Sequence, residues 1–359
     1  MEIRFLTSTD HAAYSEFLKQ DPRSLIYASA EYRDFLSAIV PGKAQCLLAL
    51  DAGRILGALP YFEHINPNGR ILINSLPWYG SHGGCVVGPA QTSGVRKALL
   101  LKYLEITSRP EVLSATMILS PYENRYLEEY LEITKPVFTE KRMGQMTSLP
   151  EGPGEPESAL LQIFSKKTRN LVRKSLKQNF KTVLTDEMWA WEFLHRTHRQ
   201  NILAVKGRAK PWEHFLALRR CFPDRDRKLY LAMSGDEPVA GLLLLFFNRT
   251  VEYFVPVIDE RFRPQQPLSQ LIFNAMADAV RQGYRWWNWG GTWLTQTSLY
   301  HFKQGWGARD LPYTYLIQLT ESGLEELKQK SGLYAEQFPF YYTHPYGVTG
   351  CLSHTGSPQ

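Results

Sequence analysis

The chain of 359 residues has few cysteines, none of the common nucleotide-binding loops and no long apolar run. Its four cysteines lie far apart, without a CxxC pair or Cys/His spacing, which argues against a disulfide framework and a zinc site. GxGxxG, Walker and HExxH motifs and a Ser-His-Asp order are also missing. The longest apolar stretch, "VAGLLLLFF" at 239–247, has the length of a buried strand and is too short to span a membrane.

These absences narrow the class of protein. The start of the sequence, "MEIRFLTSTDHAAY", has no apolar signal core, so we expect a cytoplasmic protein without a transmembrane segment. We also expect no metal and no tightly bound cofactor, and the sequence does not indicate an oligomeric state. With 44% apolar and 21% charged residues the chain is predicted to fold, and its net charge of +6 favours anionic partners such as phosphates or RNA.

The length predicts two domains, because a single core rarely grows to this size. The clearest break is "LPEGPGEPE" at Leu149–Glu157, where proline and glycine prevent a helix or a central strand. We therefore expect an N-terminal domain at 1–150 and a C-terminal domain at 151–320. A tail at 321–359, with the aromatic coil "FPFYYTHPY", is expected to dock on the body, since exposed rings are unfavourable.

The two halves repeat one order of elements: a hairpin, a strand, a helix and another strand. In the N-terminal half these are "LALDAGRILGALPYFEH", "RILINSLPW", "VRKALLLKYLEITS" and "LSATMILS". In the C-terminal half they are "LAMSGDEPVAGLLLLFFN", "VEYFVPVID", "PLSQLIFNAMADAVRQG" and "YRWWNWGG". The repeat predicts an internal duplication and an α/β (α+β) fold, with two mixed, mostly antiparallel sheets flanked by helices.

A candidate ligand slot lies between two strands of the second half. Pro256 interrupts the ladder of "YFVPVID", and Gly290 and Gly291 weaken pairing at the end of "RWWNWGG". Strands that part there leave backbone groups free to hold an extended ligand; a harmless edge strand is the other interpretation. The aromatic side chains expected to line the slot are Tyr253, Trp287 and Trp289.

The segment "SLYHFKQGWG" carries the candidate catalytic group. Ser298 is predicted to cap a short helix that holds Lys303 near the two glycines. A fixed ammonium at that point could stabilise an oxyanion or a leaving phosphate. The competing interpretation is a surface lysine whose stem covers Trp306.

A basic helix is predicted over "FSKKTRNLVRKSLKQNF" at 164–180. Phe164 and Leu176 are expected to face inward, and no acidic residue lies in the segment. Such a strip suits a phosphate backbone, although a solvated helix face looks the same in sequence. The basic residues on one face are Lys166, Arg169, Arg173 and Lys177.

Together these segments resemble the Fem-type (FemAB-like) aminoacyltransferases, which have duplicated GNAT-like acyltransferase domains. Members of that family attach amino acids to peptidoglycan precursors and use aminoacyl-tRNA as donor. The similarity spans nearly the whole chain and is strongest over Lys166–Gln178 and Tyr284–Leu319. It implies that Phe302 and Lys303 lie at the catalytic cleft, where the lysine assists the tetrahedral transition state.

The resemblance also implies a basic residue that binds substrate phosphates before the second hairpin. In "VKGRAKPW" we assign this role to Arg208, with Lys206 as the alternative and Trp212 as a neighbouring substrate contact. Two departures concern the acceptor. Ser120-Pro121 stands where peptidoglycan-specific members have Asp-Pro, and only Arg33 lies near the expected basic residue of the front domain. The coiled-coil arm of some members is missing.

The expected activity is transfer of an aminoacyl or acyl group from an activated carrier to an amine of a cell-wall precursor or another acceptor, nucleotide- or lipid-linked. Aminoacyl-tRNA is the favoured co-substrate, because the loop "DERFRPQQPLS" has no glycine and two prolines where acetyltransferases hold the CoA pyrophosphate. One alternative is N-acylation of a sugar or small amine from acyl-CoA or an acyl carrier protein. Another is a non-catalytic RNA- or glycan-binding module.

Overall fold

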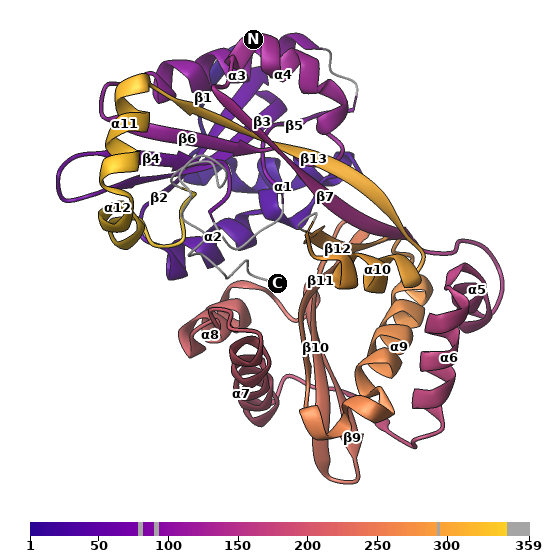
Figure 1. The fold of residues 1–359 in the computed structure, drawn as a ribbon. Coiled ribbons are helices and arrows are strands. Elements are labelled where there is room, and N and C mark those ends of the chain that lie inside the picture. Colours follow the sequence, from indigo (N-terminus) through magenta and orange to yellow (C-terminus); the bar gives the residue numbers. More distant parts are fainter. Residues whose placement is uncertain (78–81, 90–92, 293–294, 343–359) are drawn as a thin grey trace. The chain divides into compact units, whose positions relative to one another are not determined.

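The computed structural model describes residues 1–77, 82–89, 93–292 and 295–342 (Figure 1). Its strands form a mixed, mostly antiparallel sheet in the order β1-β2-β3-β4-β6-β13-β7-β12-β11-β10-β9-β8, with β5 beside β3. The chain divides into two compact units. Unit 1 comprises Met1–Arg142 and the described chain from Pro312 to Tyr342; unit 2 comprises Met143–Leu311.

Unit 1 has a core in which α3 and α4 cover one face of its strands. Its strands are β1 (Glu2–Phe5), β2 (Lys43–Asp51), β3 (Arg54–Ile65), β4 (Ile71–Asn74), β5 (Val86–Val87), β6 (Val112–Ile118), the start of β7 (Phe138–Ser148) and the end of β13 (Ala308–Leu319). Its α-helices are α1 (His11–Gln20), α2 (Ala30–Ile39), α3 (Ser93–Thr107), α4 (Leu127–Thr134), α11 (Glu321–Gln329) and α12 (Ser331–Gln337), and its 3-10 turns are η1 (Ser8–Asp10), η2 (Ile26–Ala28) and η3 (Asn124–Tyr126).

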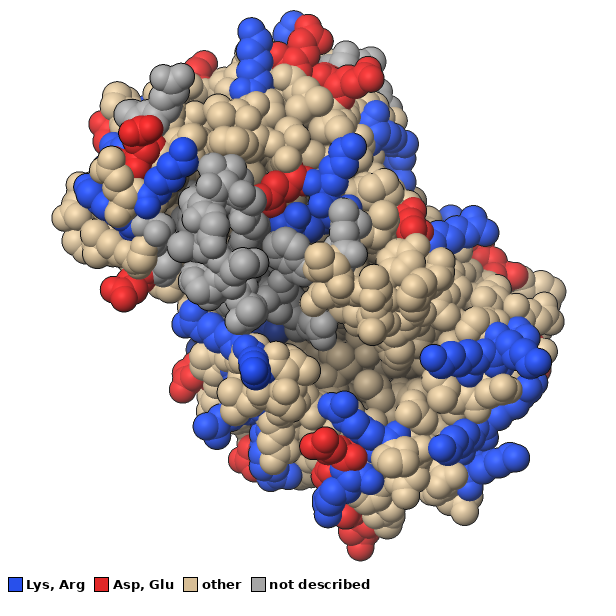
Figure 2. Space-filling model, viewed as in Figure 1, with Lys and Arg blue, Asp and Glu red and all other residues tan. Residues whose placement is uncertain are grey.

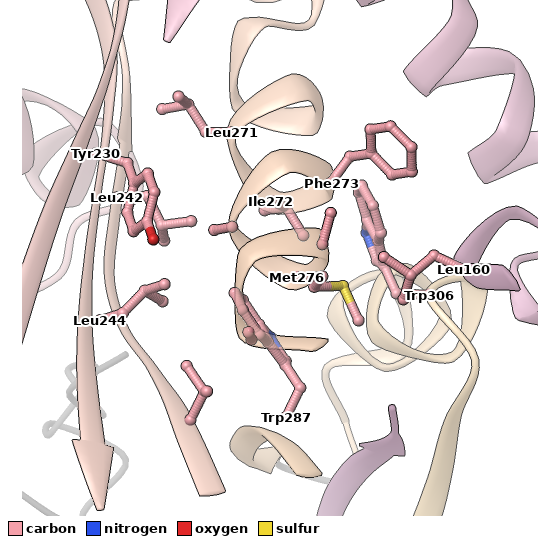
Figure 3. Close-up of a cluster of buried hydrophobic side chains, with 14 of the residues drawn as sticks. Leu160, Tyr230, Leu242, Leu244, Leu271, Ile272, Phe273, Met276, Trp287 and Trp306 are labelled. Carbon is pink, nitrogen blue, oxygen red and sulfur yellow. The ribbon is translucent and has the colours of Figure 1, made fainter. Parts of the chain in front are cut away.

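Unit 2 adds β8 (Lys181–Leu184), β9 (Arg227–Ser234), β10 (Glu237–Phe247), β11 (Thr250–Ile258) and β12 (Trp286–Thr292). Its helices are α5 (Pro156–Ile163), α6 (Lys166–Leu176), α7 (Met188–Ala204), α8 (Trp212–Cys221), η4 (Glu260–Gln265), α9 (Pro267–Arg281) and α10 (Thr297–Gly305). Figure 1 shows α7 and α8 on one side of β9–β11 and α5, α6 and α9 on the other. In the core, α9 lies between Leu242 and Leu244 of β10 and Leu160 and Trp306 (Figure 3).

The predicted duplication and fold class are confirmed. Apart from the two-residue β5 before α3, unit 1 runs β2-β3-β4-α3-β6, and unit 2 repeats this order as β9-β10-β11-α9-β12. In each unit the third and the last of these strands pair in parallel, β4 with β6 and β11 with β12. The helix α9 follows its sequence signals, because Pro267 occupies its first turn and Gly283, at φ +78°, follows its end.

The division between the units falls inside two strands instead of at the proline-rich segment 149–157. The strand β7 begins in unit 1, but Met143–Ser148 pairs with β12 of unit 2. In return, Tyr315–Leu319 of β13 pairs with β6 of unit 1. Local composition marks where a strand must end, but it does not reveal which strand becomes its partner.

The described part of the tail packs on unit 1. The backbone N–H of Tyr342 donates to Asn74 Oδ1 over 2.8 Å, and the Tyr341 hydroxyl donates to the Pro41 carbonyl over 2.7 Å. Residues 343–359 of the expected tail lie outside the described residues. None of the described helices is long and apolar enough to cross a bilayer.

The end of α10 is fixed against the start of α6. The Ser165 side chain accepts from the Thr168 backbone and caps α6, while the Ser165 N–H donates to the Gly305 carbonyl over 2.9 Å. A Cβ at Gly305 would lie 2.5 Å from Thr168 Oγ1. Only glycine therefore fits where these two helices meet.

The substitution Gly305→Ala is expected to lower the free energy of unfolding by about 1–3 kcal/mol, because the new methyl group overlaps Thr168. Denaturant titration measures the change. The control is Gly332→Ala, a helical position with open space around the added carbon, where stability should stay the same or rise. Equal stability of both variants would contradict the close approach.

Candidate active site

The strands β11 and β12 part within unit 2. Their parallel pairing covers only Thr250–Glu252 with Trp286–Asn288, although β11 continues to Ile258 and β12 to Thr292. Beyond Glu252 and Asn288 the two strands are no longer hydrogen-bonded to each other. The separation predicted from Pro256 and the glycine pair is therefore present.

A bulge at the glycine pair changes the course of β12. The register between β12 and β7 shifts between Asn288 and Gly291, and Gly290 adopts a φ of +71°. The Gly290 N–H donates to Asn288 Oδ1 over 2.9 Å, which stabilises the turn. Here Gly291 and Thr292 still pair with β7, but β12 no longer pairs with β11, and side chains bind its backbone at Gly290 and Gly291.

Lys303 binds this bulged segment. Its Nζ donates to the Gly291 carbonyl over 3.0 Å and to Thr292 Oγ1 over 2.8 Å. Thr292 in turn donates to Gln145 Oε1 over 3.3 Å, and Gln145 Nε2 donates to the Tyr300 carbonyl of α10 over 3.2 Å. The lysine is thus fixed by a polar network that joins β12, β7 and α10.

The ammonium of Lys303 is in a weakly solvated place. Only 4% of the residue is exposed, and within the described residues both hydrogen-bond partners of Nζ are neutral oxygens. Burial lowers the pKa of Lys303 to about 7, because it disfavours the charged form. An ammonium has three N–H donors, so within the described residues one donor is left beyond these two bonds. The interpretation as a surface lysine is therefore wrong.

The tryptophans form the core behind this site. Trp287, Trp289 and Trp306 are buried beside α9, and the ring of Trp289 lies 6.0 Å from that of Phe302. The indole N–H of Trp289 donates to Thr147 Oγ1 over 2.9 Å. Half-buried Tyr253 packs 4.8 Å from Trp289, ring to ring. Contacts of these aromatic side chains with a ligand stay a prediction; Trp293 lies outside the described residues.

One local expectation about α10 is wrong. The helix begins at Thr297 after Gln296, and no side chain caps it, so Ser298 lies inside the first turn. The position of α10 is instead fixed at its C-terminal end, by the contact with α6 and by the hydrogen bonds of Lys303.

The predicted phosphate-binding residues lie elsewhere in unit 2. Lys206 and Arg208 are exposed in the connection between α7 and α8, and Trp212 is half-buried at the start of α8. Both helices cover the side of the sheet opposite α9 (Figure 1). The role of these residues in binding a phosphate stays a prediction.

Lys210 and Glu252 are among the buried charged residues of unit 2 that were not predicted from the sequence. Lys210, in the same connection as Arg208, is 6% exposed, and burial lowers its pKa to about 8. Glu252 is 2% exposed at the last paired position of β11, opposite Asn288. A single acid within the apolar run "TVEYFV" was a usable signal for Glu252, whereas nothing local separates Lys210 from its two basic neighbours.

The comparisons with known proteins agree with this architecture. Residues 164–304 match the acetyltransferase (GNAT) domain family. The chain superposes on the crystal structure of FemX with a TM-score of 0.72 at 14% identity, covering 91% of this chain and 99% of FemX. The chain has the tandem GNAT fold. No curated protein matches it significantly in sequence.

Two further structures share the tandem GNAT fold at lower similarity. One is the C-terminal domain of a putative lysylphosphatidylglycerol synthetase from Agrobacterium fabrum, with a TM-score of 0.54, 10% identity and coverage of 91% of this chain and 97% of that one. The other is a tandem GNAT protein from the clavulanic acid biosynthesis pathway, with a TM-score of 0.51, 10% identity and coverage of 88% and 98%. At these identities the likeness shows the fold.

The turn before α9 in the second GNAT domain forms hydrogen bonds within itself. Its Arg261 N–H donates to Asp259 Oδ1 over 3.0 Å, and the Phe262 N–H donates to the Asp259 carbonyl. The Arg261 guanidinium pairs with both Asp259 and Glu237. Two backbone donors of the turn, those of Arg261 and Phe262, are thus occupied within it.

The basic strip of the GNAT domain is largely solvent-exposed. Figure 2 shows lysines and arginines gathered over the part of unit 2 that contains α6. Lys166, Arg173 and Lys177 are exposed, while Arg169 donates to the Phe164 carbonyl over 2.8 Å. Leu176, expected to face inward, is exposed. Among the described residues no group of three or more His, Cys, Asp and Glu could hold a metal ion.

The burial of Lys303 makes stability depend on pH in a defined direction. Between about pH 7 and pH 10 the unfolded chain retains the lysine proton that the folded chain has lost, so the free energy of unfolding rises with pH. Relative to Lys303→Met, the wild type should therefore gain stability across this window and show a constant difference below pH 7. Denaturant titrations at several pH values measure it. The exposed Lys328→Met is titrated in parallel as the control.

Proposed function

We propose that the protein is an acyltransferase that passes an aminoacyl or acyl group from an activated carrier to an amine, with aminoacyl-tRNA as the favoured donor. The acceptor is an amine of a cell-wall precursor or of another carrier-linked molecule. The observation that supports this proposal best is the buried ammonium of Lys303, hydrogen-bonded where β11 and β12 part.

In this reaction the amine nitrogen attacks the ester carbonyl carbon, and a tetrahedral intermediate with a negative oxygen forms. The free N–H donor of Lys303 stabilises that oxygen, which is worth more in a site with little water than in solution. The carbon–oxygen bond to the carrier then breaks. The proton lost by the amine balances the proton gained by the leaving oxygen. Glu252, buried at the last paired position of β11, is a candidate to accept the amine proton.

Two features favour a charged tRNA as donor over acyl-CoA. The turn before α9 uses its backbone donors internally, which weakens the site for a CoA pyrophosphate. The exposed basic side chains of α6 suit a long phosphate backbone, and Gly305 and Ser165 join this helix directly to α10. The resemblance to the Fem-type aminoacyltransferases points the same way.

Acyl-CoA- or carrier-protein-dependent acylation of a sugar or small amine is the second candidate, supported by the match of residues 164–304 to an acetyltransferase domain. A non-catalytic RNA- or glycan-binding module is the third. Transfer assays with charged tRNA and with acyl-CoA distinguish these two candidates from the tRNA-dependent acyltransferase.

The substitution Lys303→Met is expected to reduce the rate of acyl transfer by roughly 10²-fold or more, because one oxyanion donor is lost. Single-turnover transfer from charged tRNA to a panel of amine acceptors measures the rate. Donor binding should change little. The exposed Lys328→Met serves as control and should retain full turnover.

Unchanged turnover in the Lys303 variant would reject its catalytic role. Transfer from acyl-CoA but not from charged tRNA would replace the favoured donor with the second candidate. Binding of RNA without transfer from either donor would support the third.

Reversing three charges on α6 and its C-cap, in the triple variant Lys166→Glu, Arg173→Glu and Lys177→Glu, should weaken tRNA binding roughly tenfold or more and flatten its salt dependence. Filter binding at several salt concentrations tests this. The matched control carries Lys43→Glu, Lys97→Glu and Lys135→Glu, with the same change in net charge on exposed positions of unit 1. Equal weakening in both variants would mean that only net charge matters.

A further inference from the structure

Gln145 of β7 is a buried polar residue to which the proposed reaction assigns no role. It is 1% exposed, and it lies on the strand that pairs with β12 beside the Lys303 site. Gln145, Thr292, Tyr300 and Lys303 all belong to unit 2. A buried amide is unfavourable unless both of its ends have partners, so the bonds of Gln145 indicate what it does.

The bulge in β12 brings the Thr292 side chain to the face of the sheet that carries Gln145. At the register shift Gln145 alone lies opposite two residues of β12, Trp289 and Gly290. Beyond the shift Thr292 lies opposite Met143, which is two residues from Gln145 on the same strand and therefore on the same face. With an unbroken register Thr292 would lie opposite the neighbouring residue of β7 and point to the other face.

The hydrogen bonds of Gln145 run in a fixed direction. The Tyr300 carbonyl can only accept, so it binds the amide nitrogen Nε2, over 3.2 Å. The other end of the amide is then Oε1, which can only accept, and the Thr292 hydroxyl donates its single proton to it over 3.3 Å. The Thr292 oxygen therefore offers Lys303 lone pairs and no proton.

This direction makes Lys303 the donor in both of its bonds. The Gly291 carbonyl, 3.0 Å from Nζ, can only accept, and Thr292 Oγ1, 2.8 Å from Nζ, has its proton committed to Gln145. Neither partner can donate to the lone pair that a neutral amine would carry. The bonds therefore favour the ammonium and oppose burial, which lowers the pKa of Lys303 to about 7.

We propose that Gln145 is a positioning residue for the reaction at Lys303 and that it acts through Thr292. It holds the threonine oxygen as an acceptor, so the lysine side chain keeps one orientation and its charged form is stabilised. The effect of Gln145 on the transfer rate rests on the proposed function. Its effect on the protonation of Lys303 does not, because that can be measured without a substrate.

Charged groups on the elements around Lys303 do not exert this control. Arg169 of α6 binds a backbone carbonyl, and Glu252 of β11 is buried at its last paired position with β12. His301 of α10 and Asp310 of β13 are exposed. None of them contributes to the lowered pKa of Lys303, whose cause is burial.

The substitution Gln145→Leu is expected to lower the pKa of Lys303, because the freed Thr292 proton can then donate to the neutral amine. The measurement is the free energy of unfolding from about pH 5 to pH 10, in each background with and without Lys303→Met. The unfolded chain retains the lysine proton that the folded chain has lost. The stability difference between the lysine and methionine forms should therefore begin to rise at a lower pH in Gln145→Leu than in the wild type.

Two control variants distinguish this effect from a loss of packing. Gln145→Glu keeps an acceptor for the Thr292 hydroxyl, so the rise should begin at the wild-type pH or above it. Thr147→Val changes the next residue on the same face of β7 and removes the acceptor of the Trp289 indole N–H, but no partner of Lys303. In Thr147→Val the rise should begin at the wild-type pH.

In single-turnover and steady-state transfer assays, Gln145→Leu should lower kcat roughly tenfold or more and change the KM of the donor by less than about twofold. A misdirected lysine affects the reacting atoms and not donor binding. Gln145→Glu should recover most of the lost rate. If the wild type transfers no acyl group, the proposed function fails, while the pH titration still tests Gln145.

Near-UV circular dichroism checks the fold of each variant. If Gln145→Leu does not fold, Gln145→Met, which has an unbranched side chain of similar length, replaces it with the same expected result. The same onset pH in the wild type and in the folded Gln145 variant would overturn the proposal. An equal shift in Thr147→Val would overturn it as well.

Discussion

The hydrogen bonds from Lys303 to Gly291 and Thr292 are the constraint on which the rest of unit 2 depends. A cation with so little solvent is unfavourable unless neighbouring oxygens are held in position to accept from it. The bulge in β12 provides the carbonyl, Gln145 of β7 orients the threonine, and α6 fixes the end of the helix that carries the lysine. The aromatic core packs behind these elements, so the position of the Lys303 side chain is set by the fold of unit 2 itself.

Much of this site follows from local signals in the chain. A proline within a strand and two adjacent glycines at the end of the next indicate where pairing must lapse, since each removes a specific backbone interaction. The repeated order of hairpin, strand, helix and strand likewise reports elements that the structure contains. These signals predict the secondary structure of a segment and where its strand pairing ends.

These local signals do not predict which residues pack together in the folded protein. Three basic residues within five positions of the α7–α8 connection look alike in sequence, yet Lys210 is buried while Lys206 and Arg208 are exposed. The tryptophans invite a role as ligand walls, but packing against α9 places several of them in the core. The boundary between the halves was expected at the proline-rich segment, because strand partners cannot be read from local sequence. In the structure unit 1 ends at Arg142, since the following residues of β7 pair with β12.

The pairing of β13 with β6 has a consequence for how the protein is made. A ribosome that has finished residues 1–142 has released a sheet whose β6 edge still lacks its neighbour, and that neighbour arrives only after the whole of unit 2 has been synthesised. Open strand edges are prone to wrong pairing, and long-range pairing is slow. The pairing of the β6 edge is thus complete only after Tyr315–Leu319 has been synthesised.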